Sequence, residues 1–221
     1  MTIQFLSQSP NTRQTTAHLA HVLKPGTDPG RIYLLTGSIS TGPHIRQEFL
    51  DIVEWTMAAP DRELVLLVGV FKKFQDNDWI LDPVTVSKVK DDVAKLVAET
   101  GMAYLQKQQL ANVCLPITVH AAVAWHVKAI GLTGRGLDFF KATAAIFGST
   151  NFTTSARHGA NFELDVYVDG STPDGKSLLS SYTHKVGYLI QEAIQGPAKI
   201  AHFHAQVASA VGAQTGQTVV V

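Results

Sequence analysis

The chain has 221 residues, of which 45% are hydrophobic and 16% are charged, and its 18 basic and 18 acidic side chains give a formal net charge of zero. This apolar content is enough for a full hydrophobic core and excludes a disordered chain. No apolar run approaches the roughly 18 residues that a membrane-spanning helix needs. The zero net charge argues against a protein that coats nucleic acid by bulk attraction, although basic side chains can still gather locally.

The single cysteine, Cys114, excludes an internal disulfide framework and a cysteine-rich zinc site. Cys114, His120 and His126 match no common zinc spacing, so we predict neither a metal site nor a cofactor. The first residues lack the basic region and apolar stretch of a secretion signal. These features together predict a cytoplasmic protein without a membrane partner.

Apolar strands and amphipathic helices alternate along the first half of the chain. Residues 32–36 and 63–70 are apolar runs typical of buried strands. Apolar residues recur at helical spacing after Pro43 and again over residues 85–99, where Gly101 is expected to end the helix. A short strand is expected at residues 103–105. This order predicts an α/β fold with a mixed, mostly parallel sheet and helices on both faces.

The second half of the chain continues with strands and ends with helices. Strands are predicted at residues 125–132, 143–148 and 162–168, the last from its clean alternation of apolar and polar residues. A helix is predicted over residues 177–195, and an alanine-rich helix from Lys199 to about Ala210. No linker or repeat is visible, so we expect a single domain over residues 1–221, with its C-terminal helices at about 177–212.

Polar residues that can handle a phosphate follow one another on these later strands. His126 and Lys128 are two residues apart, so on a strand they share a face. Ser149 and Asn151 come at the end of the next strand, and Glu163 occupies a polar position of the strand after that. Lysine supplies positive charge, serine and asparagine donate hydrogen bonds, and histidine attacks phosphorus or moves a proton. A nearby glutamate can fix the histidine tautomer.

His126-x-Lys128, followed about twenty residues later by Gly-Ser-Thr-Asn-Phe-Thr at 148–153, resembles the signature of the phospholipase D superfamily. Residues 155–164, which lead to Glu163, are similar to the small bacterial nucleases of that superfamily, including its metal-independent restriction endonuclease branch. Thr133 stands where the larger members carry an aspartate, and this departure favours the nuclease branch over the lipid-cleaving enzymes. The resemblance is strongest over residues 126–169.

The resemblance implies a mechanism and an assembly. Family members need two His-x-Lys motifs per active site and this chain has one, which implies a homodimer with His126 of each subunit at the two-fold axis. One His126 would attack phosphorus to form a phosphohistidine, and the other would protonate the leaving oxygen. Lys128, Ser149 and Asn151 would surround the phosphoryl oxygens, with Glu163 beside the histidine. No metal takes part in this scheme.

DNA, with RNA as the other possibility, is the substrate that this branch implies. Lys141, Arg157 and Arg135 are predicted to line a path for the phosphate backbone, together with Lys72 and Lys73, although a solvated surface explains the same residues. The chain after Glu163 is too short for a sequence-reading domain. Cleavage is therefore either unspecific or directed by a partner protein.

Three other interpretations stay open. His126 and Lys128 could be an ordinary exposed strand pair, and Glu163 a solvated strand residue. The alternative function is a catalytically weak phospholipase D-like module that binds nucleic acid or a protein, which Thr133 and the zero net charge favour. A lipid phosphodiesterase is less well supported, because no amphipathic membrane anchor is visible.

Overall fold

A computed structural model of the protein describes residues 3–9, 12–14, 19, 30–110, 112–134, 138–158, 161–195, 199–208 and 219–220. Its centre is a sheet in which the strands follow the order β12-β11-β7-β4-β3-β8-β9-β10-β1-β2. The bounds of these strands are β1 (Ile3–Ser9), β2 (Thr12–Arg13), β3 (Arg31–Thr36), β4 (Glu63–Val70), β7 (Asn112–Val123), β8 (Ala129–Thr133), β9 (Ala142–Gly148), β10 (Glu163–Asp169), β11 (Lys199–Ala208) and β12 (Val219–Val220).

The sheet is mixed, as the sequence predicts, but antiparallel pairs outnumber parallel ones among the described strands. Only the β3–β4 and β4–β7 pairs are parallel. Each of these pairs is joined by a helical crossover, whereas β8, β9 and β10 pair antiparallel with their neighbours in sequence. The expected mostly parallel arrangement therefore holds only for the first three strands of the core.

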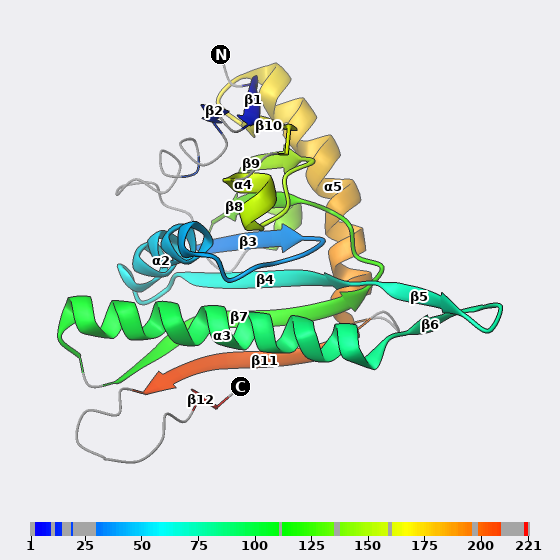
Figure 1. Cartoon of the computed structure of the whole chain (residues 1–221). Coiled ribbons are helices and arrows are strands. Elements are labelled where there is room, and N and C mark those ends of the chain that lie inside the picture. Colours follow the sequence, from blue (N-terminus) through cyan, green and yellow to red (C-terminus); the bar gives the residue numbers. More distant parts are fainter. Residues whose placement is uncertain are drawn as a thin grey trace.

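Helices cover both faces of the sheet, as predicted (Figure 1). The helices are α2 (Pro43–Met57), α3 (Pro83–Gln108), α4 (Thr154–Arg157) and α5 (Pro173–Gln195), with a 3-10 turn at Phe139–Lys141. Leu34 packs in the same core as Phe49 of α2, whereas its neighbour Leu35 packs in the core that holds Ile190 of α5. Alternate residues of the strand thus pack into two separate hydrophobic cores, one on each face of the sheet. No helix of the described residues is long and apolar enough to cross a membrane.

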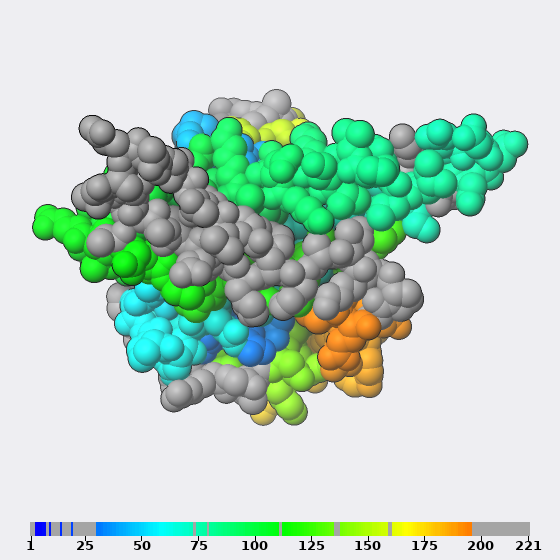
Figure 2. Space-filling view, turned by 90° about the horizontal axis from the view of Figure 1, so that it is seen from below, coloured from blue at the N-terminus to red at the C-terminus, as the bar shows by residue number. Residues whose placement is uncertain are grey.

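A two-stranded hairpin of β5 (Lys72–Gln75) and β6 (Asp78–Leu81) leaves the body of the molecule directly after β4. It projects from one end of the sheet, where the space-filling view shows it standing clear of the other described elements (Figures 1 and 2). The sequence analysis did not anticipate this hairpin.

Three predicted elements are wrong or displaced. The C-terminal helix from Lys199 to about Ala210 is the strand β11, which pairs antiparallel with β7, so backbone pairing at the sheet edge prevails over the helix propensity of its alanines. The expected strand at 103–105 belongs to α3, because this helix continues through Gly101 and ends at Gln109, whose φ is 55°. The strand predicted at 125–132 begins only at Ala129.

Candidate active site

The strand order brings all five residues of the predicted catalytic set to one edge of the sheet. β3, β4, β7 and β9 end at this edge, and β8 and β10, which run antiparallel to β9, begin there. His126 and Lys128 lie between β7 and β8, Ser149 and Asn151 follow β9, and Glu163 is the first residue of β10. Residues from three separate parts of the chain therefore meet at one place.

His126 and Lys128 are in direct contact. The Lys128 Nζ lies 2.8 Å from Nδ1 and 2.9 Å from Nε2 of the His126 ring. Both residues precede β8, so their contact arises from the irregular segment before the strand and not from the strand alternation that the sequence predicts. An ammonium group only donates, and a neutral imidazole has a single acceptor nitrogen, so the tautomer of His126 decides which of the two contacts is a hydrogen bond.

Partial burial lowers the pKa of Lys128, and the negative charge of Glu163 only partly opposes this effect. The rings of Phe71 and His126 meet edge-on, with their centroids 5.6 Å apart. His126 thus contacts a cation and an aromatic ring while its side chain stays exposed.

Two glycines fix the backbone around His126. A Cβ atom on Gly37 would lie 3.1 Å from Cδ2 of His126 and 3.1 Å from Oδ1 of Asn151. A Cβ atom on Gly69 would lie 2.2 Å from the carbonyl oxygen of Trp125 and 2.7 Å from that of Gly37. The ends of β3 and β4 therefore pack directly against the segment that carries His126. Gly69 was expected only as part of an apolar strand, and the interruption that it makes there is the signal that could have linked it to the site.

Asn151 joins the loop after β9 to the loop after β3. Its Oδ1 accepts hydrogen bonds from the backbone N–H groups of Gly37 at 3.1 Å and Ser38 at 3.2 Å. The next residue repeats the link, because the Phe152 N–H donates to Oγ1 of Thr36 at 2.9 Å. Since the amide oxygen of Asn151 is engaged in this way, its amide NH₂ is the group that can donate to a ligand.

Ser149 and Glu163 flank the site with fewer contacts to its centre. The Ser149 Oγ accepts a hydrogen bond from the Leu164 N–H at 3.0 Å, which continues the pairing of β9 and β10 by one residue. A carboxylate oxygen of Glu163 accepts from the Asn161 amide at 3.4 Å. Within the described residues Glu163 acts on Lys128 through its charge and makes no hydrogen bond to His126, which does not match the tautomer-fixing role that the resemblance implies.

The prediction that Arg157 lines a substrate path does not fit its position. Arg157 is 2% exposed, and its Nε forms an ion pair with Oε2 of Glu48, itself 5% exposed. Its guanidinium also lies 5.5 Å from the centre of the Phe152 ring. The other Glu48 oxygen is 2.5 Å from Nε2 of His158, whose ring stacks on His44. Arg157 thus anchors α4 beneath the loop that carries Asn151.

Of the two other predicted substrate-binding residues, only Lys141 is described, and it does not join the site. Lys141 precedes β9, whereas Ser149 follows that strand, so Lys141 lies at the opposite edge of the sheet. There it borders a hollow that also contains Lys176. Arg135 lies outside the described residues. Lys72, in contrast, stands on the hairpin that begins beside His126.

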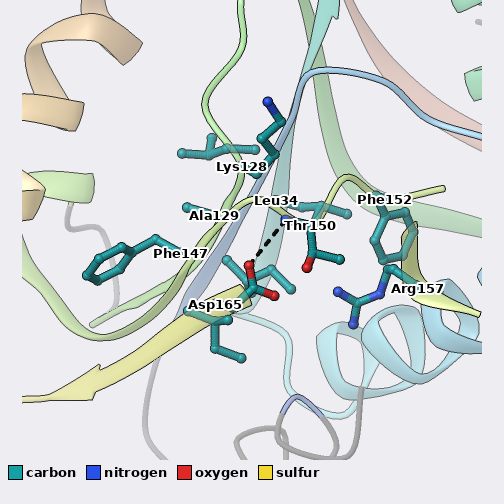
Figure 3. Close-up of a pocket in the computed structure, with 11 residues that line it drawn as sticks. Leu34, Lys128, Ala129, Phe147, Thr150, Phe152, Arg157 and Asp165 are labelled. Atoms are coloured by element: carbon teal, nitrogen blue, oxygen red, sulfur yellow. Dashed lines mark hydrogen bonds between the residues drawn. The ribbon is translucent and has the colours of Figure 1, made fainter. Parts of the chain in front are cut away.

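A small cavity of about 10 Å³ lies behind Lys128 (Figure 3). Asp165, which is 2% exposed, borders it and accepts a hydrogen bond from the Thr150 N–H at 3.2 Å. This space is about the size of one water molecule, so it is too small to admit a substrate. A larger hollow of about 480 Å³ adjoins His126 on the side of Leu189 and Glu192. No three His, Cys, Asp or Glu side chains of the described chain are grouped to hold a metal ion.

Comparison with known proteins identifies the fold. No family model and no curated protein matches the sequence. Phosphatidylserine synthase from Haemophilus influenzae Rd KW20 superposes with a TM-score of 0.53 at 9% identity, over 86% of this chain and 39% of that one. Polyphosphate kinase from Porphyromonas gingivalis gives 0.50 at 11% identity, over 88% and 26%. Nuc from Salmonella typhimurium, a phospholipase D family member, gives 0.47 at 13% identity, over 91% and 97%. The chain shares a fold with the phosphatidylserine synthase and the polyphosphate kinase.

The shared fold does not by itself assign a reaction. The chain spans nearly all of Nuc but well under half of the synthase and the kinase, and the identities are too low to carry an activity across. The function has to be argued from the residues at the sheet edge.

Proposed function

We propose that the protein is a metal-independent phosphodiesterase of the phospholipase D superfamily, an endonuclease that cleaves DNA through a phosphohistidine intermediate. The contact between Lys128 and both ring nitrogens of His126 carries this proposal. A nucleophile and a cation that touch each other, beside an asparagine amide and a serine hydroxyl, are the groups that a phosphoryl transfer needs.

The first step follows from these groups. A phosphodiester that binds above His126 offers its anionic oxygens to Lys128, Asn151 and Ser149. As the ammonium group moves from the imidazole to a non-bridging oxygen, the ring nitrogen regains an unshared lone pair. This nitrogen attacks phosphorus, so a P–N bond forms and the P–O bond to the leaving group breaks.

The leaving oxygen needs a proton, and one chain contributes one His126. We infer that a second copy of the chain provides it, with the two histidines meeting across a two-fold axis. The second histidine gives its proton to the leaving oxygen, then takes one from a water molecule that attacks phosphorus. The P–N bond breaks and its electron pair returns to the first histidine. The exposure of His126 is compatible with this arrangement.

The choice of a nucleic acid substrate rests on the likeness of residues 126–169 to small nucleases. The structural neighbours include a phosphatidylserine synthase and a polyphosphate kinase, so their names point to other phosphates too. Cleavage is either unspecific or directed to particular DNA sites by a partner protein.

The test is incubation of the purified protein with excess chelator and end-labelled single-stranded DNA, double-stranded DNA and RNA, beside phosphatidylcholine vesicles. We expect cleavage of DNA by the wild type and by Lys141→Ala, whose lysine lies at the other edge of the sheet, and no cleavage by His126→Ala. Cleavage of the lipid alone would replace the substrate class. Binding of DNA without turnover, unchanged in His126→Ala, would favour the catalytically weak binding module.

A further inference from the structure

A hollow of about 480 Å³ opens beside the proposed nucleophile, between the end of β7 and the last turns of α5. His126 forms part of its wall, together with the rest of residues 122–127. β7 and α5 pack against each other at this end of the molecule (Figure 1). Small-molecule sites have volumes of about 300–1,000 Å³, so the hollow is large enough for a group that is attached to the phosphate.

The walls of the hollow are mostly apolar. α5 contributes Leu189 and Ala193, which share a helix face with Glu192 because residues three and four positions apart are neighbours. The segment before β8 contributes Trp125 and Val127. No lysine or arginine borders the hollow within the described part of the chain. Its walls therefore suit the uncharged part of a substrate and not the phosphate.

Glu192 is the acidic side chain on these walls. It is exposed, and among the described residues it makes no hydrogen bond or ion pair. It stands in the last turn of α5, where the partial negative charge of the helix end favours a basic side chain over an acidic one. Helix stability therefore does not explain a carboxylate at this place, whereas a ligand with hydrogen-bond donors does.

The carboxylate indicates which donors the ligand carries. It has two acceptor oxygens and no donor, so its best partner offers two adjacent N–H groups. Of the four DNA bases, guanine has such a pair on its Watson–Crick edge, formed by the ring N1–H and the 2-amino group. On the same edge, adenine and cytosine place an amino group beside a ring nitrogen that accepts, and thymine places its single donor between two carbonyl oxygens. This edge is accessible only when the base is unpaired.

We propose that the hollow beside His126 is a pocket for an unpaired guanine next to the scissile phosphate, with Glu192 accepting from the N1–H and the 2-amino group. This inference rests on the proposed function and deepens it, because it assigns a single-stranded substrate and a preferred base. With the base in the hollow, the attached phosphate reaches His126, where Lys128 and Asn151 receive its oxygens. Glu192 thus selects the place of cleavage and takes no part in the exchange of bonds.

The first test maps the cleavage of end-labelled thymidine oligonucleotides that contain one guanine, hypoxanthine or adenine. We expect the wild type to cut next to guanine about five to a hundred times faster than next to thymine, the usual discrimination of one bidentate pair. Hypoxanthine keeps the N1–H but lacks the 2-amino group, so the rate next to it should lie well below the rate next to guanine.

Variants of Glu192 should change the ratio of these rates. Glu192→Ala should reduce the ratio of the guanine rate to the thymine rate to about one. Glu192→Gln has one acceptor and one donor in place of two acceptors, so it should no longer distinguish guanine from hypoxanthine. Asp174→Asn is the matched control, because it removes an acidic side chain from the first turn of the same helix and should keep the wild-type ratios.

The second test measures the binding of mononucleotides by titration calorimetry, which needs no turnover. Deoxyguanosine monophosphate should bind the wild type more tightly than deoxyinosine or thymidine monophosphate, and Glu192→Ala should remove this difference. Phosphocholine is titrated beside them, because a cationic headgroup also suits a carboxylate.

Equal cleavage next to every base, with equal binding of the mononucleotides, would overturn the guanine pocket while leaving the proposed nuclease intact. Guanine-selective binding without cleavage of any DNA would support the pocket and overturn the nuclease. Tight binding of phosphocholine that is lost in Glu192→Ala, without selection of guanine, would replace the base with a lipid headgroup.

Discussion

Replacing Gly69 with alanine should impair the reaction although Gly69 touches no substrate. A Cβ atom at this position would lie 2.2 Å from the Trp125 carbonyl oxygen and 2.7 Å from that of Gly37. Both obstacles are backbone atoms, so no side-chain rotation relieves the overlap. Because ordinary contacts of this kind need about 3.5 Å, the segment that carries His126 has to move by roughly 1 Å.

A displacement of this size has a large kinetic effect and a modest structural one. Misplacing a reacting group by about 1 Å lowers a rate by about a hundredfold. Overpacking of a well-filled region costs about 1–3 kcal/mol of unfolding free energy. We therefore expect Gly69→Ala to fold, to unfold at a somewhat lower temperature, and to lose about two orders of magnitude in kcat.

The assay is the chelator-resistant hydrolysis of single-stranded DNA, with thermal unfolding followed by circular dichroism. Gly170→Ala is the matched control, since a Cβ atom there would meet only the Thr143 carbonyl oxygen, at 3.8 Å. It should match the wild type in both measurements. Wild-type kcat in Gly69→Ala would refute the argument that this backbone contact holds His126 in place.

Three further predictions concern side chains around the site. Asn151→Asp keeps the acceptor for the N–H of Gly37 but loses the NH₂ donor, so this variant should keep the unfolding temperature and lose activity. Asn151→Ala loses both groups, so it should lose activity and also about 1–3 kcal/mol of stability. Arg157→Ala leaves Glu48 buried without its main ion-pair partner and should cost about 3–5 kcal/mol in urea unfolding; a small change would instead favour a substrate-binding role for Arg157. Burial lowers the pKa of Lys128, and activity needs the charged form of this lysine. The alkaline decline of kcat/KM should therefore occur at a pH below the pKa of an ordinary lysine, and it should move to higher pH in Lys128→Arg. A decline at the same pH in Lys128→Arg would show that another group causes it.

The apolar strands were predictable because both of their faces are covered. β3 and β4 were found from continuous apolar runs, and β9 and β10 from their composition and alternation. β7 was not predicted, because Pro116 and several polar residues interrupt its apolar pattern. β11 was assigned to a helix because only its pairing with β7, distant in sequence, makes it a strand.

The candidate site shows the same division between local and distant information. The spacing of His126 and Lys128 indicated their contact, although they precede the strand on which they were placed. An arginine is usually exposed, and only its partner Glu48, more than a hundred residues away, makes Arg157 a buried anchor. Lys141 is close to Ser149 in sequence, but a whole strand separates them in space.

The links that hold Asn151 to the loop after β3 join residues that lie 114 and 113 positions apart in sequence. Contacts of this kind form slowly, because a long stretch of chain must be closed before any of them stabilises the structure. After dilution from urea, helices will regain their circular dichroism before β3, β8 and β9 have assembled. Nuclease activity should therefore return with the slowest refolding phase, and a chain that has recovered its helices early will still be inactive.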